Sequence, residues 1–207
     1  MIKTIKENTS YELVEKKSKF IAQIFYVQSE DEAINIIKNI KKKYYDAKHN
    51  CFAYSIMTKN GIISRMSDDG EPSGTAGAPM LNILLKKDLS NVLLIVTRYF
   101  GGILLGTGGL VKAYSDVCLN ALNKTTFINE DFGYESKLYI DYSDFENFNY
   151  YCHKNMINIL KTEYIDKISC IVELTNEEKD ILLNSKEELN FKIYNFEVLK
   201  EKIIKKY

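Results

Sequence analysis

Apolar and polar positions along the first 130 residues predict four strands and three helices. Apolar residues recur at helical spacing from Ala33 to Ile40, which predicts an amphipathic helix over 30–43. Ser29 and Glu32 fit a capping box at its start. Asn60 and Gly61 separate two short apolar runs, a pattern typical of a β-hairpin turn. The predicted strands are 19–27, 50–57, 62–66 and 91–97, and the predicted helices are 30–43, 76–87 and 108–123.

The chain changes character near residues 124–133. Eight of the ten glycines and both prolines lie between Gly70 and Gly109. The later elements follow the order β-α-β-β-α-β, which predicts a ferredoxin-like sandwich with both helices on one face of the sheet. We therefore expect an α+β protein with domains 1–130 and 131–207. The later elements are a strand at 134–142, a helix at 144–154, strands at 158–164 and 167–174, a helix at 176–189 capped by Thr175, and a strand at 191–196.

The composition indicates a globular, cytoplasmic protein without membrane contact. Hydrophobic residues make up 45% and charged residues 27% of the chain, which is ordinary for a soluble domain. No window approaches the roughly 18 apolar residues that a membrane span needs, and the N-terminal segment lacks the apolar region of an export signal. The four cysteines lie far apart without a CxxC pattern, so we expect free thiols.

The charge is balanced overall but unevenly distributed. Residues 1–130 contain 17 Lys and Arg against 13 Asp and Glu, whereas residues 131–207 contain 11 against 15. The positive excess of the first part is compatible with contact to RNA phosphate but is too small to require it.

Residues 67–79 form the first chemically distinctive segment. Asp68, Asp69 and Glu71 place three carboxylates within four residues, and these repel one another unless a cation, solvent or backbone N–H groups neutralise them. One interpretation is a divalent-cation site built from these oxygens. The other is a structural loop whose carboxylates cap the next helix and accept hydrogen bonds from amides. Ser73 and Thr75 complete the candidate residues of this loop.

Residues 98–114 form the second such segment, running from a strand through a Gly-rich loop into a helix. Free N–H groups and the dipole at the start of that helix favour anion binding. Neither nucleotide fingerprint is met, because Thr107 and Gly108 replace the Lys-Ser/Thr of a Walker A loop and Val111 replaces the third glycine of GxGxxG. Alternatively, the glycines let the helix pack closely on the sheet. The anion-binding candidates in the loop and helix are Gly101, Gly102, Gly106, Thr107, Gly108, Gly109 and Lys112.

Arg98 is one of only two arginines among 28 basic residues. A planar guanidinium after a core strand indicates that two parallel hydrogen bonds are needed there. Arg98 could grip a partner's phosphate, or it could pair internally with Asp68, Asp69 or Glu71.

His49 and Lys19 are secondary candidates. His49 and Cys51 are two residues apart and would share one face of a strand. No third group that would orient a Cys–His catalytic pair is visible in the sequence. A buried thiol and a hydrogen-bonded imidazole are therefore the favoured interpretation.

Four ordered blocks of the chain carry a resemblance: residues 17–22, 49–54, 67–79 and the discontinuous run 98–102, 105–110 and 113–114. Together these blocks resemble the YigZ/Impact family, in its bacterial two-domain branch. The resemblance implies an N-terminal domain similar to the second domain of a small-subunit ribosomal protein and to domain IV of elongation factor G. It implies a C-terminal domain similar to domain V of that factor. Relatives often carry Lys at the position of Leu104, so this loop lacks a positive charge.

The resemblance also implies a function. Eukaryotic relatives regulate translation during amino-acid starvation, and no catalytic activity is established in the family. We therefore expect a non-catalytic binding protein that contacts RNA, the ribosome or a translation factor, without a resident cofactor and with its oligomeric state open. One alternative is a phosphate-handling small-molecule enzyme that uses the acidic and Gly-rich loops with a divalent cation, since the same fold hosts small-molecule kinases. Another is a protein–protein adaptor that uses some of the 15 tyrosines.

Overall fold

The computed structural model describes residues 1–184 and 189–206. Internal contacts divide the chain into two compact units, Ile2–Ile128 and Asn129–Tyr207 with Met1. Both units combine helices with antiparallel strand pairs, so the predicted α+β class is confirmed.

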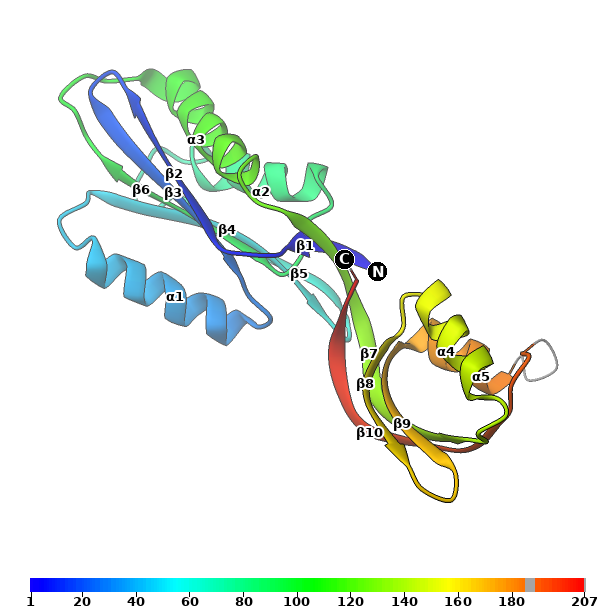
Figure 1. Cartoon of the computed structure of the whole chain (residues 1–207). Helices are drawn as coiled ribbons and strands as arrows, with labels where there is room; N and C mark the ends of the chain where they lie inside the picture. The colour runs from blue at the N-terminus through cyan, green and yellow to red at the C-terminus, as the bar shows by residue number, and fades with distance from the viewer. Residues whose placement is uncertain (185–188, 207) are drawn as a thin grey trace. The chain divides into compact units, whose positions relative to one another are not determined.

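The first unit contains an antiparallel sheet with the strand order β2-β3-β6-β4-β5 (Figure 1). Because β6 lies between β3 and β4, the helix α1 (Glu30–Lys43) crosses over an inserted strand. The helix α2 (Gly77–Lys86) makes the equivalent crossing from β5 to β6. The strands are β2 (Thr9–Glu15), β3 (Ser18–Tyr26), β4 (His49–Thr58), β5 (Gly61–Ser67) and β6 (Val92–Tyr99).

Helices cover both faces of this sheet. The helices α2 and α3 (Gly106–Leu122) pack on one face, and α1 packs on the other (Figure 1). Alternate residues of β6 enter the two cores: Leu94 faces α2 and α3, whereas Leu93 faces α1. A strand buried on both faces needs apolar residues at successive positions, which explains the unbroken run from Val92 to Val96.

Two local sequence signals, a helix cap and a hairpin turn, correctly predicted element boundaries. The helix α1 has the predicted bounds, and its Ser29 hydroxyl accepts a hydrogen bond from the Glu32 N–H at 3.2 Å. The β4–β5 hairpin turns at the predicted Asn60-Gly61, where Gly61 has a φ of +114°.

Two N-terminal strands were not predicted. The short strand β1 (Ile2–Ile5) places Ile5 in the core of the first unit. Among the described strands, β2 pairs with β3 alone, so one of its edges is open and polar residues are tolerated there. Tyr11 and Leu13 pack against the core, so β2 has the two-residue period of a strand. The period is short and charged residues flank it, which hides the strand in the sequence.

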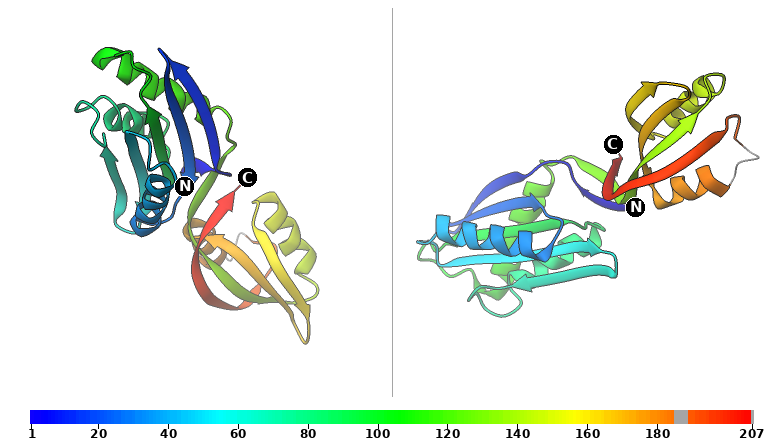
Figure 2. Two further views of the ribbon diagram at one scale, coloured as in Figure 1. Left: turned by 90° about the vertical axis from the view of Figure 1, so that its left-hand side faces the viewer. Right: turned by 90° about the horizontal axis from the view of Figure 1, so that it is seen from below.

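The second unit has the predicted β-α-β-β-α-β order. Its strands are hydrogen-bonded in the order β10-β7-β9-β8. Both helices lie on one face of the sheet (Figure 1 and Figure 2). Residues from both of them, including Phe148, Cys152 and Leu182, belong to a single core with the strands. The elements are β7 (Phe127–Ile140), α4 (Phe145–Lys154), β8 (Asn158–Tyr164), β9 (Ile168–Thr175), α5 (Asn176–Asn184) and β10 (Ile193–Lys206).

The predicted extent of the last strand was wrong. The expected strand ended at residue 196, but β10 continues to Lys206 and pairs with β7 as far as Asn129. Lysines and glutamates dominate this extension and hide its strand character in the sequence. Pairing with β7 supplies the backbone partners that hold it extended. Residues 185–188 of the helix predicted at 176–189 lie outside the described residues.

None of the helices in residues 1–184 and 189–206 is long and apolar enough to cross a membrane.

Candidate functional site

Four connections meet at one end of the first unit's sheet. The strands β3 and β4 begin at this end, where β5 and β6 finish, as the pairs His49–Arg98 and Phe52–Ser67 show. The connections are residues 16–17, 44–48, 68–76 and 100–105. Residues of the last three connections border a cavity of about 360 Å³, whose walls include His49, Glu71, Arg98, Phe100, Leu104 and Thr107. The acidic loop and the Gly-rich loop, separate in the sequence, thus border one cavity.

Arg98 and Glu71 form a buried ion pair in the cavity wall. Arg98 Nη1 donates to Glu71 Oε1 at 2.6 Å, and the two side chains retain 6% and 2% of their exposure. Arg98 Nη2 lies 3.4 Å from the Ser18 hydroxyl oxygen, and Nε has no hydrogen-bond partner among the described residues. The rings of Phe20 and Phe100 lie 5.3 and 5.7 Å from the guanidinium carbon. Of the two interpretations of Arg98, the structure contains the internal pair.

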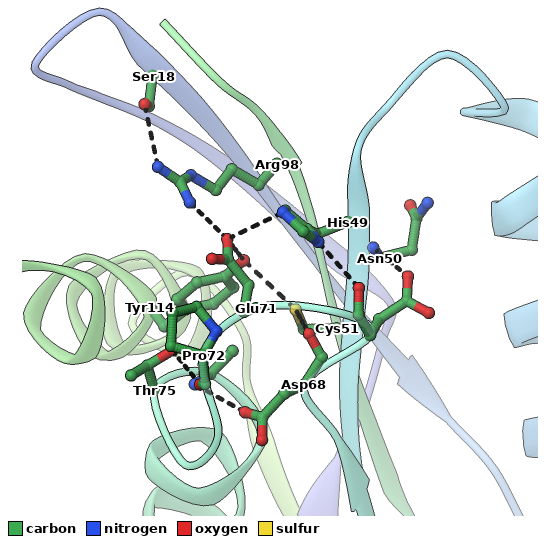
Figure 3. Close-up of polar contacts among 12 residues, drawn as sticks. Ser18, His49, Asn50, Cys51, Asp68, Glu71, Pro72, Thr75, Arg98 and Tyr114 are labelled. Carbon is green, nitrogen blue, oxygen red and sulfur yellow. Dashed lines mark hydrogen bonds and ion pairs between the residues drawn. The ribbon is translucent and has the colours of Figure 1, made fainter. Parts of the chain in front are cut away.

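Tyr114 and Cys51 extend the network below Glu71 (Figure 3). The Tyr114 hydroxyl donates to Glu71 Oε1 at 2.9 Å, and Cys51 Sγ lies 3.3 Å from that hydroxyl and 3.0 Å from the Asp68 carbonyl oxygen. Burial, despite the Tyr114 hydrogen bond, raises the pKa of the Cys51 thiol to about 12. Burial likewise raises the pKa of the Tyr114 hydroxyl. Both groups are therefore neutral at physiological pH, and Cys51 is not a thiolate nucleophile.

His49 bridges the network and the cavity. Its Nδ1 lies 2.8 Å from the Asp69 carbonyl oxygen. Because that carbonyl only accepts, Nδ1 carries a proton, which leaves Nε2 facing Glu71 Oε1 at 3.9 Å. The His49 ring and the Arg98 guanidinium thus both face one carboxylate (Figure 3). The other secondary candidate, Lys19, pairs at the surface with Glu12 at 2.8 Å.

Asp68 holds the acidic loop against the start of α2. Its Oδ1 accepts hydrogen bonds from the Ala76 and Gly77 N–H groups at 3.0 and 2.8 Å, and Oδ2 accepts from the Gly74 N–H at 2.9 Å. Burial alone would raise the pKa of Asp68, but these three hydrogen bonds hold it below its ordinary value. Asp68 thus satisfies free N–H groups at the start of α2, as the side chain of a helix cap does.

Asp69 is engaged by a different set of partners. It binds Lys41 at 2.6 Å and the Asn50 N–H at 2.7 Å. Among the described residues, no three His, Cys, Asp or Glu side chains form a group that could hold a metal ion. The geometry therefore gives no support to a cation site shared by Asp68, Asp69 and Glu71.

Ser73 and Thr75 complete the acidic loop. Thr75 donates from its hydroxyl to the Pro72 carbonyl at 2.7 Å and thereby closes a turn, whereas Ser73 is exposed.

The Gly-rich loop is anchored by Gly101. Its N–H donates to the Ser18 hydroxyl at 3.2 Å, and a Cβ at this position would lie 2.0 Å from the Lys17 carbonyl carbon. Gly102 and Gly106 have φ values of +82° and +73°, which favour glycine. The loop is thus shaped by close backbone approach and by left-handed turns.

The start of α3 differs from the expectation. The helix begins at Gly106 rather than at residue 108, so Gly106 and Thr107 border the cavity. Gly109 and Lys112 instead line a separate hollow of about 150 Å³ with Lys16 and Glu15. A Cβ on Gly108 would meet open space.

Several residues that build the site were not among the predicted site residues. Ser18, Asn50 and Tyr114 supply hydrogen bonds, and Phe100 and Leu104 supply apolar walls. Ser18, Asn50, Phe100 and Tyr114 lie within the blocks that carry the family resemblance, and membership in these blocks was the sequence signal that could have identified them.

Comparisons with known proteins place this geometry in a family context. The Impact N-terminal domain family matches residues 16–122. IMPACT family member YvyE of Bacillus subtilis is 48% identical over 120 residues, which cover 58% of this chain and 55% of that protein. An IMPACT family member of Haemophilus influenzae is 34% identical over 167 residues, covering 78% and 79%. The match to YvyE thus spans about half of that relative's length.

A solved structure described as a hypothetical protein has a similar fold. It is 27% identical, with a TM-score of 0.62 over 96% of this chain and 97% of that one.

Proposed function

Because the chain belongs to the Impact family, we propose that it is a non-catalytic binding protein that regulates translation in the cytoplasm. Its first unit contacts RNA, the ribosome or a translation factor, and the end of the sheet that carries the cavity is the contact surface. The regulation of translation is the role that the family resemblance implies for eukaryotic members.

The internal matching of charges around the cavity is the observation that carries the non-catalytic part of this proposal. Glu71 binds Arg98, Asp69 binds Lys41, and Asp68 is held by backbone amides. A general base or a metal ligand must keep a lone pair available for a substrate or ion. These carboxylates are already occupied, which supports a structural role for them and a binding role for the surface that they shape.

We also propose the finer fold assignments that the resemblance implies. The first unit is similar to the second domain of a small-subunit ribosomal protein and to domain IV of elongation factor G, and the second unit is similar to domain V. The strand order β10-β7-β9-β8, with both helices on one face, supports the ferredoxin-like assignment of the second unit. Relatedness to ribosome-binding modules is consistent with a partner in translation.

Sedimentation of a cell extract together with a reconstituted translation reaction tests the proposal. We expect the full chain to sediment with ribosomal or translation-factor fractions at low salt and to change the rate of protein synthesis when added in stoichiometric amounts. Weaker binding at raised salt would indicate contact with phosphate. Absence of the chain from these fractions, together with an unchanged synthesis rate, would reject the proposal.

The phosphate-handling enzyme is the alternative with less support. It needs Arg98 for a phosphate and the acidic loop for a divalent cation, but Arg98 binds Glu71, Asp69 binds Lys41, and Asp68 binds backbone amides. A rise in melting temperature with magnesium and one nucleotide, absent with either alone, would favour this alternative.

A further inference from the structure

We propose that the cavity and the loop beside it form a docking site for an extended, acidic segment of a partner protein, with one apolar side chain of that segment seated in the cavity. This inference rests on the proposed binding function and specifies the chemistry of the partner.

The loop between β6 and α3 presents apolar side chains to solvent. Phe100, Ile103 and Leu104 are 45%, 42% and 81% exposed. Phe100 and Leu104 also border the cavity, which Leu105 and Leu110 line as well. Its volume of about 360 Å³ lies within the range of roughly 300–1,000 Å³ that is typical of ligand pockets. An apolar cavity continuous with exposed apolar residues matches a protein ligand better than a free ion.

The loop that carries this surface is held in place by its neighbours. The Gly101 N–H binds the Ser18 hydroxyl, and the Gly101 backbone packs directly against Lys17. Phe100 lies against the buried Arg98 guanidinium. A partner would therefore meet a surface that is already shaped, which lowers the entropic cost of binding.

The charges left over at this end of the sheet are mainly positive. The nearby acidic side chains are neutralised internally: Glu71 by Arg98, and Asp69 by Lys41. Asp68, which backbone N–H groups hold, and Glu15, Asp46 and Asp116 are the other carboxylates of this end. They are outnumbered by lysines that form no ion pair with any described residue, namely Lys16, Lys17, Lys42, Lys43, Lys48 and Lys112.

This combination favours an acidic peptide over an RNA strand. Complementary charge steers association and fixes orientation, while burial of apolar surface supplies affinity. An RNA backbone would satisfy the lysines but would leave Ile103 and Leu104 without a partner. A peptide that carries carboxylates and a leucine-like side chain provides partners for the lysines and for the apolar side chains.

Selection from a random library of displayed peptides against the immobilised full chain tests the inference. We expect enrichment of acidic peptides that contain Leu, Ile or Phe. One synthetic peptide from the selection, labelled with a fluorophore, is then titrated with the wild type and with two variants. Leu104→Ser removes the most exposed apolar side chain of the loop and should weaken binding roughly tenfold. Ile62→Ser changes an exposed side chain at the opposite end of the sheet and should leave binding unchanged.

A labelled single-stranded RNA measured in the same assay separates the outcomes. Enrichment of basic peptides, no enrichment over empty resin, or equal peptide affinity of the wild type and Leu104→Ser would overturn the docking site. RNA binding that Leu104→Ser leaves unchanged, without any selected acidic peptide, would also overturn it while the proposed role in translation stands. Peptide binding by a chain that does not alter protein synthesis would retain the docking site and reject the translational role. Unchanged melting temperatures verify that both variants are folded.

Discussion

Arg98 and Glu71, 27 residues apart in the chain, meet at 2.6 Å inside the wall of the cavity. One partner comes from the end of β6 and the other from the loop between β5 and α2. Because Tyr114 donates to the same carboxylate oxygen, the pair joins a central strand, an acidic loop and a helix. The pair therefore ties together the elements that shape the candidate site.

Breaking this pair on one side should be costly. Glu71→Gln leaves the guanidinium buried without a counter-charge, and we expect a loss of about 3–5 kcal/mol in the free energy of unfolding measured with urea. The double variant Glu71→Leu/Arg98→Met should lose less stability than the sum of the losses from Glu71→Leu alone and Arg98→Met alone, because neither charge then remains buried without its partner. As a control, Glu12→Gln breaks the exposed pair with Lys19 and should cost less than about 1 kcal/mol. Equal effects of Glu71→Gln and Glu12→Gln would contradict the structural role of the buried pair.

Alanine substitutions at two glycines of this region should change the stability of the protein in opposite directions. Gly101→Ala places a Cβ against the Lys17 backbone and should destabilise the protein by about 1–3 kcal/mol, since backbone must move to make room. Gly108→Ala adds a methyl group in open space within α3 and should stabilise by about 0.5–1 kcal/mol through helix propensity. Thermal and urea unfolding measure both effects. A tolerated Gly101→Ala would show that the loop is not anchored as described.

Asp68 should contribute to stability in a pH-dependent way. Its pKa is lower in the folded protein than in the unfolded chain, so the ionised carboxylate stabilises the fold above about pH 4. This contribution is lost as the pH falls below 4 and passes through the lowered pKa. Asp68→Asn should therefore be less stable than the wild type by about 1 kcal/mol at pH 7, and the difference should shrink toward pH 3. Urea unfolding of both proteins at pH 7, 5 and 3 measures it, and a difference that grows on acidification would contradict the assignment.

The four cysteines should be unreactive in the native protein. All are buried free thiols, and burial raises the pKa of Cys51 and Cys152 to about 12. A thiol reagent such as Ellman's reagent at pH 8 should modify no thiol rapidly in the folded chain and all four in denaturant. A stoichiometric fast phase from Cys51 in the native protein would revive its interpretation as a nucleophile.

The sequence predicted the elements whose signals are local. The bounds of α1 and β8 match the predictions, and the buried run of β6 and the Asn60-Gly61 turn were recognisable from residue types alone. The strands β2 and the second half of β10 were missed because charged residues dominate their exposed positions. Their extended conformation depends on the neighbouring strand.

The candidate site was likewise predicted only in part. The sequence indicated that Arg98 was unusual and that residues 67–79 and 98–114 carried the chemistry. It could not select Glu71 as the partner of Arg98, or separate Gly109 and Lys112 from the cavity. The apolar character of the cavity, which depends on Phe100 and Leu104, was also not visible.

By itself, the amino-acid sequence determined the helices, buried strands and turns that carry strong local signals, because hydrophobic period, caps and glycine conformation act between near neighbours. Only the tertiary structure decided which charges neutralise each other and which surface remains open. Antiparallel register brings Ser18 to Arg98 across 80 positions of chain, and a contact at that separation depends on the packing of the whole sheet rather than on any local pattern.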